Sequence, residues 1–281
     1  MQHGTVRAFI GFLLPAFVLL ALTRLFPIGE AVYASLNDPA TGEFFGAYTA
    51  LSDSDSFRNS IRVTLWFNLI INPAQVLASL ALAVLLTQRL PGEGLARTVI
   101  FLPAAIPQAV STVVWGIAMR PNDGLMNSVL QLVGIGPQPF LTSPHQALYA
   151  IMVIASWVGV GYWMMFLIAG IRDVPPSLLE AASVDGAGWW RQLWSIILPL
   201  LRRPMAFVLV AATVANFLLV VPVQVLTNGG PAGSTNLLMH EIYRQAFTFA
   251  DLPFASAQVM VLTAITLVIV TIQFRLLKPA T

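Results

Sequence analysis

The sequence predicts an all-α membrane protein with six transmembrane helices, and three observations support this prediction. The chain of 281 residues is 57% hydrophobic and only 9% charged, whereas soluble domains carry about 25% charged residues. The apolar residues gather in six continuous runs, each close to the roughly 20 residues with which a helix crosses a bilayer. Backbone groups in lipid have no water partner, so each continuous run is expected to be helical.

The first three runs come before the middle of the chain. The run 8–26 could be mistaken for a signal peptide, but its apolar core is too long and no small-residue cleavage site follows it, so we expect an uncleaved span. The second run is 63–86 and the third is 99–118. Proline removes a helix hydrogen bond and predicts a kink. Such prolines are Pro15, Pro73, Pro103, Pro107 and, in the fifth run, Pro222.

The last three runs are 147–171, 205–226 and 257–277. The segment 172–204, between the fourth and fifth runs, is the longest of the connections on its side of the membrane. We expect the six spans to form a single transmembrane domain that covers residues 1–281.

Basic residues gather in alternate connections, which predicts the orientation. The rule that lysine and arginine stay on the cytoplasmic side then places both termini and the segment 172–204 in the cytoplasm. One side carries Arg7, Arg89, Arg97, Arg172, Arg191, Arg202, Arg203, Arg275 and Lys278, and the other carries Arg58, Arg62, Arg120 and Arg244.

The composition excludes several classes of function. There is no cysteine for a disulfide or a thiolate metal site, and the three histidines are scattered, so no metal or other cofactor is expected. The net charge of +2 does not suggest nucleic acid. The only lysine is Lys278, so no phosphate-binding P-loop can be written and the chain has no ATPase site of its own.

Two membrane-bound alternatives are also disfavoured. An ion-coupled carrier usually shows ionisable residues within its spans, and here such residues are almost absent. An intramembrane enzyme would need a nucleophile with a base, or paired acids, and no span holds a Ser/His pair or an acidic dyad.

The segment 172–204 predicts two short helices. The first begins after Pro175-Pro176, with Ser177 and Glu180 spaced as a capping box, and Gly186 is suited to the left-handed position after its end. The second begins near Gly188 and ends at Pro199. Its apolar face is formed by Trp190, Leu193, Trp194 and Ile197.

Two interpretations of these helices remain open from physics alone. Both could lie on the membrane surface with tryptophans at the headgroups, which fits the second helix. The first helix has small side chains and no aromatic anchor, so it could instead be a docking site for a partner that approaches its backbone closely.

The order of residues in this loop resembles a known signature. Glu180-Ala181-Ala182, then Gly186, then Ile196 and Leu198-Pro199 match the EAA motif of permease subunits in binding-protein-dependent ABC importers. The resemblance covers nearly all of residues 10–275 and points to the carbohydrate-uptake branch. Its other motifs are Arg97–Pro103 with Ile106, Pro107 and Trp115, Pro121–Asn127, and Leu226–Pro231 with Thr235, Tyr243, Ala246 and Phe247.

The resemblance implies a type I ABC importer permease fold with a cytoplasmic coupling helix. It implies a second, related permease subunit, a dimer of ATPase subunits and an extracytoplasmic solute-binding protein as partners. The location would be a bacterial or archaeal plasma (inner) membrane. ATP-driven closure of the ATPases would move the two coupling loops together and switch the path. The coupling residues implied here are Glu180, Ala181, Ala182, Asp185 and Gly186.

A sugar is the cargo that this branch implies. Gly159, Tyr162 and Asn216 resemble positions that line the sugar site of maltose-type permeases, and Gln224 is another polar residue of the fifth span. Each could instead hold helices together, which is the default for an amide in a span and our expectation for Asn68, Asn72 and Gln75.

The cargo is not fixed by the sequence. The short loop 36–60 replaces the large insertion of the maltose type, so glycerol phosphate, a polyol or an amino sugar remain alternatives. A phosphorylated cargo would need a basic residue in the path, and the candidate within the expected spans is Arg24, since Arg275 lies near the cytoplasmic end of the last span. The glycine-rich stretch 227–231 is expected on the outer side, where it could contact the binding protein or the gate.

Overall fold

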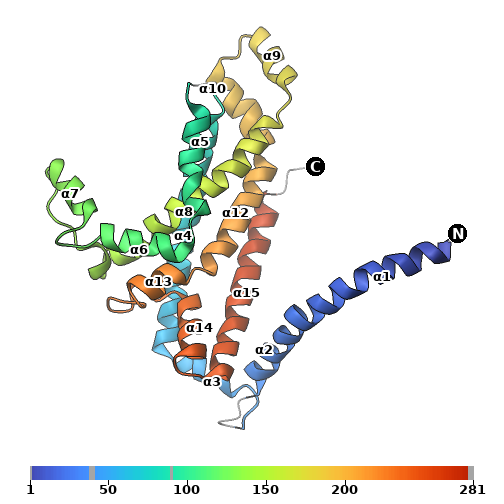
Figure 1. Ribbon diagram of the computed structural model, residues 1–281, viewed down its shortest axis with the longest axis vertical. Helices are drawn as coiled ribbons and strands as arrows, with labels where there is room; N and C mark the ends of the chain where they lie inside the picture. Colours follow the sequence, from blue (N-terminus) through green and yellow to red (C-terminus); the bar gives the residue numbers. More distant parts are fainter. Residues whose placement is uncertain (1, 38–41, 89–90, 278–281) are drawn as a thin grey trace. The chain divides into compact units, whose positions relative to one another are not determined.

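The computed structural model describes residues 2–37, 42–88 and 91–277, and for residues 2–10 it describes the backbone alone (Figure 1). Arg89 and Lys278, which contribute to the charge bias, lie outside the described residues. The chain falls into two compact units, Met1–Asp55 with Ile242–Thr263 and Ser56–Glu241 with Ala264–Thr281. We call them unit 1 and unit 2. The single permease domain over 1–281 stays a prediction.

Unit 1 contains one long helical stretch near the N-terminus. Helix α1 (Gln2–Leu20) leads through the π-helical turn η1 (Ala21–Leu25) into α2 (Phe26–Leu36). The expected end of the first span at residue 26 is therefore wrong, because Pro27 falls in the first turn of α2, where proline is tolerated. Helix α3 (Gly46–Asp53) follows, and the Tyr48 hydroxyl lies 3.1 Å from the Ser35 hydroxyl of α2.

Unit 2 is organised around three long apolar helices. These are α4 (Asp55–Leu86), α8 (Ala147–Arg172) and α12 (Arg202–Phe217), which a short break separates from α13 (Val221–Leu226). Two apolar clusters lie between them. One centres on Phe67, Ile71, Ile151 and Val223, and the other on Ala83, Met164, Leu167, Val208 and Ala212.

The third expected span is bent. Helix α5 (Glu93–Phe101) continues into the 3-10 turn η2 (Leu102–Ala105), and α6 (Gln108–Ala118) follows at an angle of 102°. This break at Pro107 confirms the kink that the prolines of the run 99–118 predict. Ile106 has an extended backbone because proline disfavours the helical conformation of the residue before it, here Pro107. Helix α6 then packs along α13.

Close approach of α8 to α5 depends on one glycine. A Cβ atom at Gly161 would lie 2.1 Å from the backbone oxygen of Ile100. At the other end of α5, the Arg97 guanidinium donates to the Leu86 carbonyl, at 3.1 Å from Nε, and pairs with Glu93 at 3.2 Å. Arg97 thus satisfies a carbonyl at the end of α4 that has no partner within the helix.

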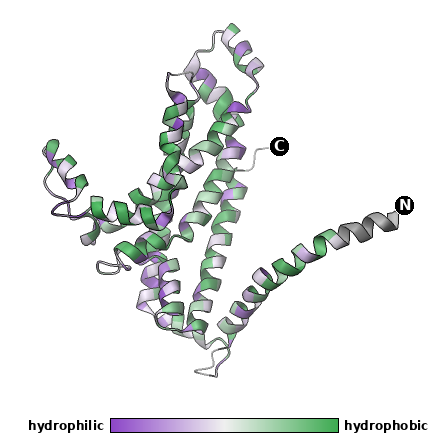
Figure 2. Ribbon diagram, in the orientation of Figure 1, coloured by the Kyte–Doolittle hydropathy of each residue, from purple (hydrophilic) through white to green (hydrophobic). Residues whose placement is uncertain are grey.

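The helices confirm the predicted fold class. Within the described residues five helices are long and apolar enough to cross a membrane, and the bent pair α5–α6 brings the number to as many as six. They include α15 (Leu252–Leu277), which, like α14 (Leu238–Phe247), has residues in both units. Figure 2 shows the apolar residues concentrated along the long helices.

Replacing Gly161 by alanine should weaken the contact between α8 and α5. The added methyl group meets backbone, which cannot rotate away, so we expect a loss of about 1–3 kcal/mol and a lower thermal midpoint of the purified protein in detergent. The matched control is Gly94→Ala in α5, where a Cβ atom has nothing within 4 Å. Equal midpoints for the two variants would contradict the proposed role of Gly161.

Candidate functional site

The segment 172–204 joins α8 to α12, and we call it the coupling loop after its predicted role. It contains α9 (Pro176–Val184), α10 (Trp189–Gln192), the π-helical turn η4 (Leu193–Ile197) and α11 (Leu198–Leu200). Figure 1 shows α9 at one tip of unit 2, beyond the ends of the bundle helices. Of the five predicted coupling residues, Glu180, Ala181 and Ala182 lie on α9, and Asp185 and Gly186 directly follow its end. Four of the five are exposed, and Ala182 is half-buried.

The predicted capping box is absent. Helix α9 begins two residues earlier than a Ser177 cap requires, its N-cap residue is Pro175, and no side chain caps it. Pro176 causes this difference because its fixed φ angle suits the first helical position. Ser177 is thereby drawn inside the helix, where its hydroxyl cannot take the capping position.

The predicted end of α9 is confirmed. Gly186 has φ = +78°, its amide donates to the Ser183 carbonyl at 3.0 Å, and the Ala187 amide donates to the Ala182 carbonyl at 2.8 Å. This pair of hydrogen bonds is a Schellman motif. Residues with a Cβ atom rarely adopt such a φ angle, so Gly186 fixes the direction in which the chain leaves the coupling helix.

A glutamine that the sequence analysis did not single out braces the loop. The Gln192 amide of α10 donates to the Ser183 hydroxyl at 2.8 Å and to the Ala187 carbonyl at 2.9 Å. The same nitrogen lies 3.5 Å from the Leu179 carbonyl. Gln192 comes 13 residues after Leu179, and this separation matches no helical repeat that could have predicted the contact. Gln192 makes α9 and α10 one rigid corner.

The second helix of the loop does not end at Pro199. The helical backbone continues through η4 and α11 to Leu200, one residue beyond the expected end. Of the expected apolar face, Leu193 is buried, whereas Trp190 and Trp194 are 67% and 66% exposed. Such exposed tryptophans suit a membrane interface.

A chain of buried amides connects α4, α8 and α12. The Asn216 amide donates to Asn72 Oδ1 at 2.7 Å and to Gln75 Oε1 at 3.1 Å. Gln75 in turn lies 3.3 Å from the Ser156 hydroxyl of α8, and the Asn72 amide donates to Asn68 Oδ1 at 3.1 Å. The expectation that Asn68, Asn72 and Gln75 join helices is confirmed for Asn72 and Gln75.

The predicted sugar-site residues do not form one cluster. Gly159 faces the Gln75 side chain, which a Cβ atom would meet at 2.9 Å, and Asn216 belongs to the amide chain. Tyr162 is 41% exposed and packs edge-on against Trp163 and Phe166. Gln224 is half-buried in α13. A substrate-binding role for these four residues stays a prediction.

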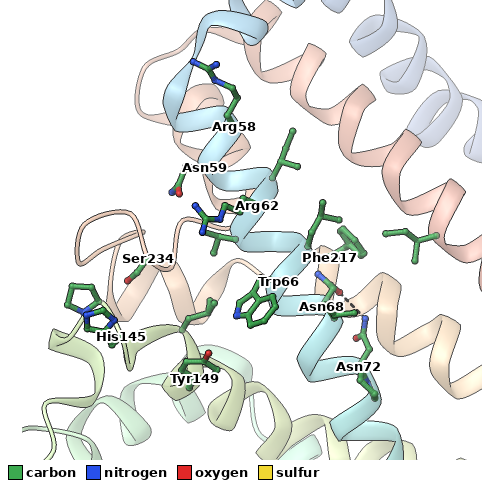
Figure 3. A pocket seen from close by; sticks show the side chains of 18 of the residues that line it. Arg58, Asn59, Arg62, Trp66, Asn68, Asn72, His145, Tyr149, Phe217 and Ser234 are labelled. Atoms are coloured by element: carbon green, nitrogen blue, oxygen red, sulfur yellow. Dashed lines mark hydrogen bonds between the residues drawn. The ribbon is translucent and has the colours of Figure 1, made fainter.

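A large cavity in unit 2 lies along α4, and we call it the α4 cavity (Figure 3). Its volume is about 1250 Å³, above the range of roughly 300–1,000 Å³ that is usual for ligand pockets. The polar and aromatic side chains that line it are Arg58, Asn59, Arg62, Trp66, Asn68, Asn72, His145, Tyr149, Phe217, Ser234 and Gln273.

The α4 cavity corrects one expectation about charge. Arg24 was the expected basic candidate for the path, but Arg58 and Arg62 lie on α4 itself and line the cavity. Hydropathy starts the second span at Val63, so both arginines were expected outside it. The helix begins at Asp55, and charged residues can occupy its first two turns.

A smaller aromatic pocket of about 500 Å³ lies between α4, α6 and α8. Trp115 and Trp157 meet edge-on in its wall with ring centroids 5.7 Å apart, and Tyr149 lines both this pocket and the α4 cavity. Aromatic faces of this kind can pack against a sugar ring. Among the described residues no group of three or more His, Asp or Glu side chains could hold a metal ion.

Two further sequence motifs, 121–127 and 226–231 with Thr235, form hydrogen bonds that close their own loops. Asn127 bonds the carbonyls of Pro121 and Gln138 at 2.8 and 2.9 Å and accepts from the Gln138 amide, which closes the loop around α7 (Leu125–Leu132). The stretch 227–231 is closed by Thr235, whose hydroxyl lies 2.8 Å from that of Thr227 and donates to Gly230.

The long apolar helices define a membrane-embedded protein. The chain belongs to the family described as binding-protein-dependent transport system inner membrane component, whose model matches residues 42–281. It is therefore a multi-pass inner-membrane permease subunit, without an ATPase site of its own. The recognition of an ABC importer permease from the sequence is confirmed.

Named relatives agree with this assignment. The chain is 31% identical over 94% of its length to the sn-glycerol-3-phosphate transport system permease protein UgpA of Agrobacterium fabrum, covering 92% of that protein. It is 32% identical over the same share to the UgpA protein of Yersinia pestis, again covering 92%. A crystal structure of a bacterial ABC transporter for the acidic polysaccharide alginate has a chain of the same fold, with TM-score 0.83, 21% identity and coverage of 96% and 94%.

The amide chain should contribute measurably to stability. Replacing either Asn72 or Asn216 by alanine removes the hydrogen bond that these two residues form between α4 and α12. Hydrogen bonds between helices contribute about 0.6 kcal/mol on average and up to about 1.7 kcal/mol in membrane proteins. We expect a double-mutant cycle on Asn72→Ala and Asn216→Ala to give a coupling energy in this range, measured by denaturation in detergent. Strict additivity of the two losses would contradict the interaction.

Proposed function

We propose that this chain forms half of the translocation path of an ATP-driven importer for a sugar or a sugar-derived solute. The family membership supports the importer, and the observation that carries the proposal beyond it is the exposed, rigidly closed helix α9 between α8 and α12. A second, homologous permease subunit would complete the path. A binding protein outside the membrane would deliver the cargo, as the family description implies.

The coupling helix is the proposed socket for the ATPase. Glu180, Ala181, Asp185 and Gly186 are exposed, and the small side chains of α9 permit close approach of a partner. The Schellman motif and Gln192 give the loop one fixed shape, which a moving partner needs in order to transmit displacement. Two ATPase subunits would dock, one on this loop and one on the loop of the second permease subunit.

The charge bias supports a cytoplasmic location for α9 and for both termini, where ATP is available. Reporter fusions to the C-terminus provide a direct check, because a cytoplasmic reporter such as a fluorescent protein should be active there. An active periplasmic reporter at the same position would contradict this orientation.

A phosphorylated polyol is a second candidate cargo. The relatives at 31–32% identity are named for sn-glycerol 3-phosphate, and Arg58 and Arg62 supply positive charge in the α4 cavity. Sugar contacts by Gly159, Tyr162, Asn216 and Gln224 remain part of the primary proposal. Uptake assays with labelled sugars and glycerol 3-phosphate in cells that carry the whole importer test both.

Substituting Glu180 by proline should uncouple transport. A proline in the interior of α9 removes a helix hydrogen bond at a cost of about 3 kcal/mol or more, so the socket loses its shape while the spans stay folded. We expect cargo-stimulated ATP hydrolysis by the reconstituted complex to be lost. Ser177→Ala is the matched control on the same helix, because Ser177 caps nothing. Full stimulation in the Glu180→Pro complex would overturn the coupling role.

A further inference from the structure

The two ends of the α4 cavity carry different polar side chains, arginines at one end and amides at the other. Arg58 and Arg62 lie at the end near the start of α4, and the buried amides of Asn68 and Asn72 lie further along the same helix (Figure 3). We propose that this cavity is a solute site for a small polyhydroxylated anion. Arg62 would hold the anionic group and the two amides the hydroxyl groups. The inference rests on the proposed function as a permease subunit.

The spacing along α4 brings these groups onto one face. Arg58, Arg62, Leu65, Leu69 and Asn72 follow each other at helical intervals of three or four residues, so they form a single stripe. Asn68 lies six residues after Arg62, a rise of about 9 Å, and Asn72 ten residues after it, about 15 Å. A solute several carbon atoms long can therefore reach from the guanidinium to an amide.

The charge of the lining favours an anion. Two arginines line the α4 cavity, and none of its lining residues is an aspartate or a glutamate. The Arg62 guanidinium offers five donors in a planar arrangement that matches phosphate and carboxylate oxygens. Its neighbours Leu65, Trp66 and Leu69 are apolar, and a less polar surrounding strengthens the attraction between opposite charges.

The amides retain capacity for a ligand. Asn68 donates one hydrogen to the Thr64 carbonyl at 2.9 Å, and Asn72 donates one to Asn68. Each amide carries two hydrogens, so each keeps one for a hydroxyl oxygen of a solute. Asn216 holds Asn72 at 2.7 Å, which fixes the orientation of that amide before a ligand arrives. The exposed faces of Trp66 and Tyr149 lie nearby for the carbon skeleton.

The wall beside Arg62 is held in place by hydrogen bonds. The Asn59 amide donates to the Gly233 carbonyl at 2.9 Å, and the Leu238 amide donates to the Thr64 hydroxyl at 2.7 Å. These bonds tie the segment after the 227–231 stretch to α4 and bring Ser234 into the lining. A site that is already shaped loses less freedom when a ligand binds.

Protection of an introduced thiol tests the site directly. The chain has no cysteine, so Leu69→Cys places a single reactive group on the cavity face of α4, where Leu69 is 67% exposed. The importer complex in nanodiscs would be treated with a maleimide, and labelling of this chain followed with glycerol 3-phosphate, glucuronate, glycerol or glucose present. Leu125→Cys on α7, 64% exposed and outside the cavity, is the control thiol.

We expect an anionic polyol to slow labelling of Leu69→Cys and to leave Leu125→Cys unaffected. Adding Arg62→Gln should raise the concentration that protects by about tenfold or more, the scale of one charge-assisted hydrogen bond, whereas Arg62→Lys should retain part of the protection. Glycerol 3-phosphate and glucuronate separate a phosphate from a carboxylate as the bound group.

Four results would overturn the inference. Equal protection by the neutral compounds, or protection that Arg62→Gln leaves unchanged, would remove the anion site. Absence of protection by all four compounds, in a complex that imports a sugar or glycerol 3-phosphate, would remove the cavity as a solute site and leave the proposed function intact. A complex that imports none of the four compounds, together with no protection, would contradict the proposed cargo class as well.

Discussion

The amide chain between α4, α8 and α12 is the interaction on which the described fold of unit 2 depends. In lipid, helices gain little by burying apolar surface against each other, so polar contacts and close packing must select the arrangement. Asn216 provides the polar contact by reaching Asn72 and Gln75. Gly159 makes room for Gln75, and Gly161 lets α5 approach. The position of α4, and with it the position of the cavity, follows from these contacts.

The coupling loop joins two of the helices that this chain of amides holds together. Helix α9 follows α8 and precedes α12, so a force on α9 would act on both of these helices. Ser156 of α8 and Asn216 of α12 both contact Gln75 of α4. Gln192 and the Schellman motif hold α9 and α10 together. In the proposed coupling, this connection would carry the displacement from the ATPase to the path.

The sequence predicted those features that depend on hydropathy and on single residues. Continuous apolar runs gave the spans, and Gly186 gave the end of α9. Pro176 displaced the expected cap, and the turns before Pro27 and Pro199 widened instead of ending their helices, because proline acts through its neighbours as well as through itself. The α4 cavity could not be predicted, since Arg62, Tyr149 and Ser234 are separated in sequence and meet only after packing.

The proposed docking of a separate ATPase subunit on α9 is tested most directly by photo-crosslinking from α9 to its neighbour in the assembled importer. Val184 is 88% exposed on α9, and the chain has no native cysteine, so Val184→Cys with a thiol-directed photo-crosslinker would report on its neighbour in the assembled importer. We predict an adduct with the ATPase subunit whose yield changes when ATP binds. Adducts with lipid alone, in a complex that still hydrolyses ATP on addition of cargo, would contradict the claim.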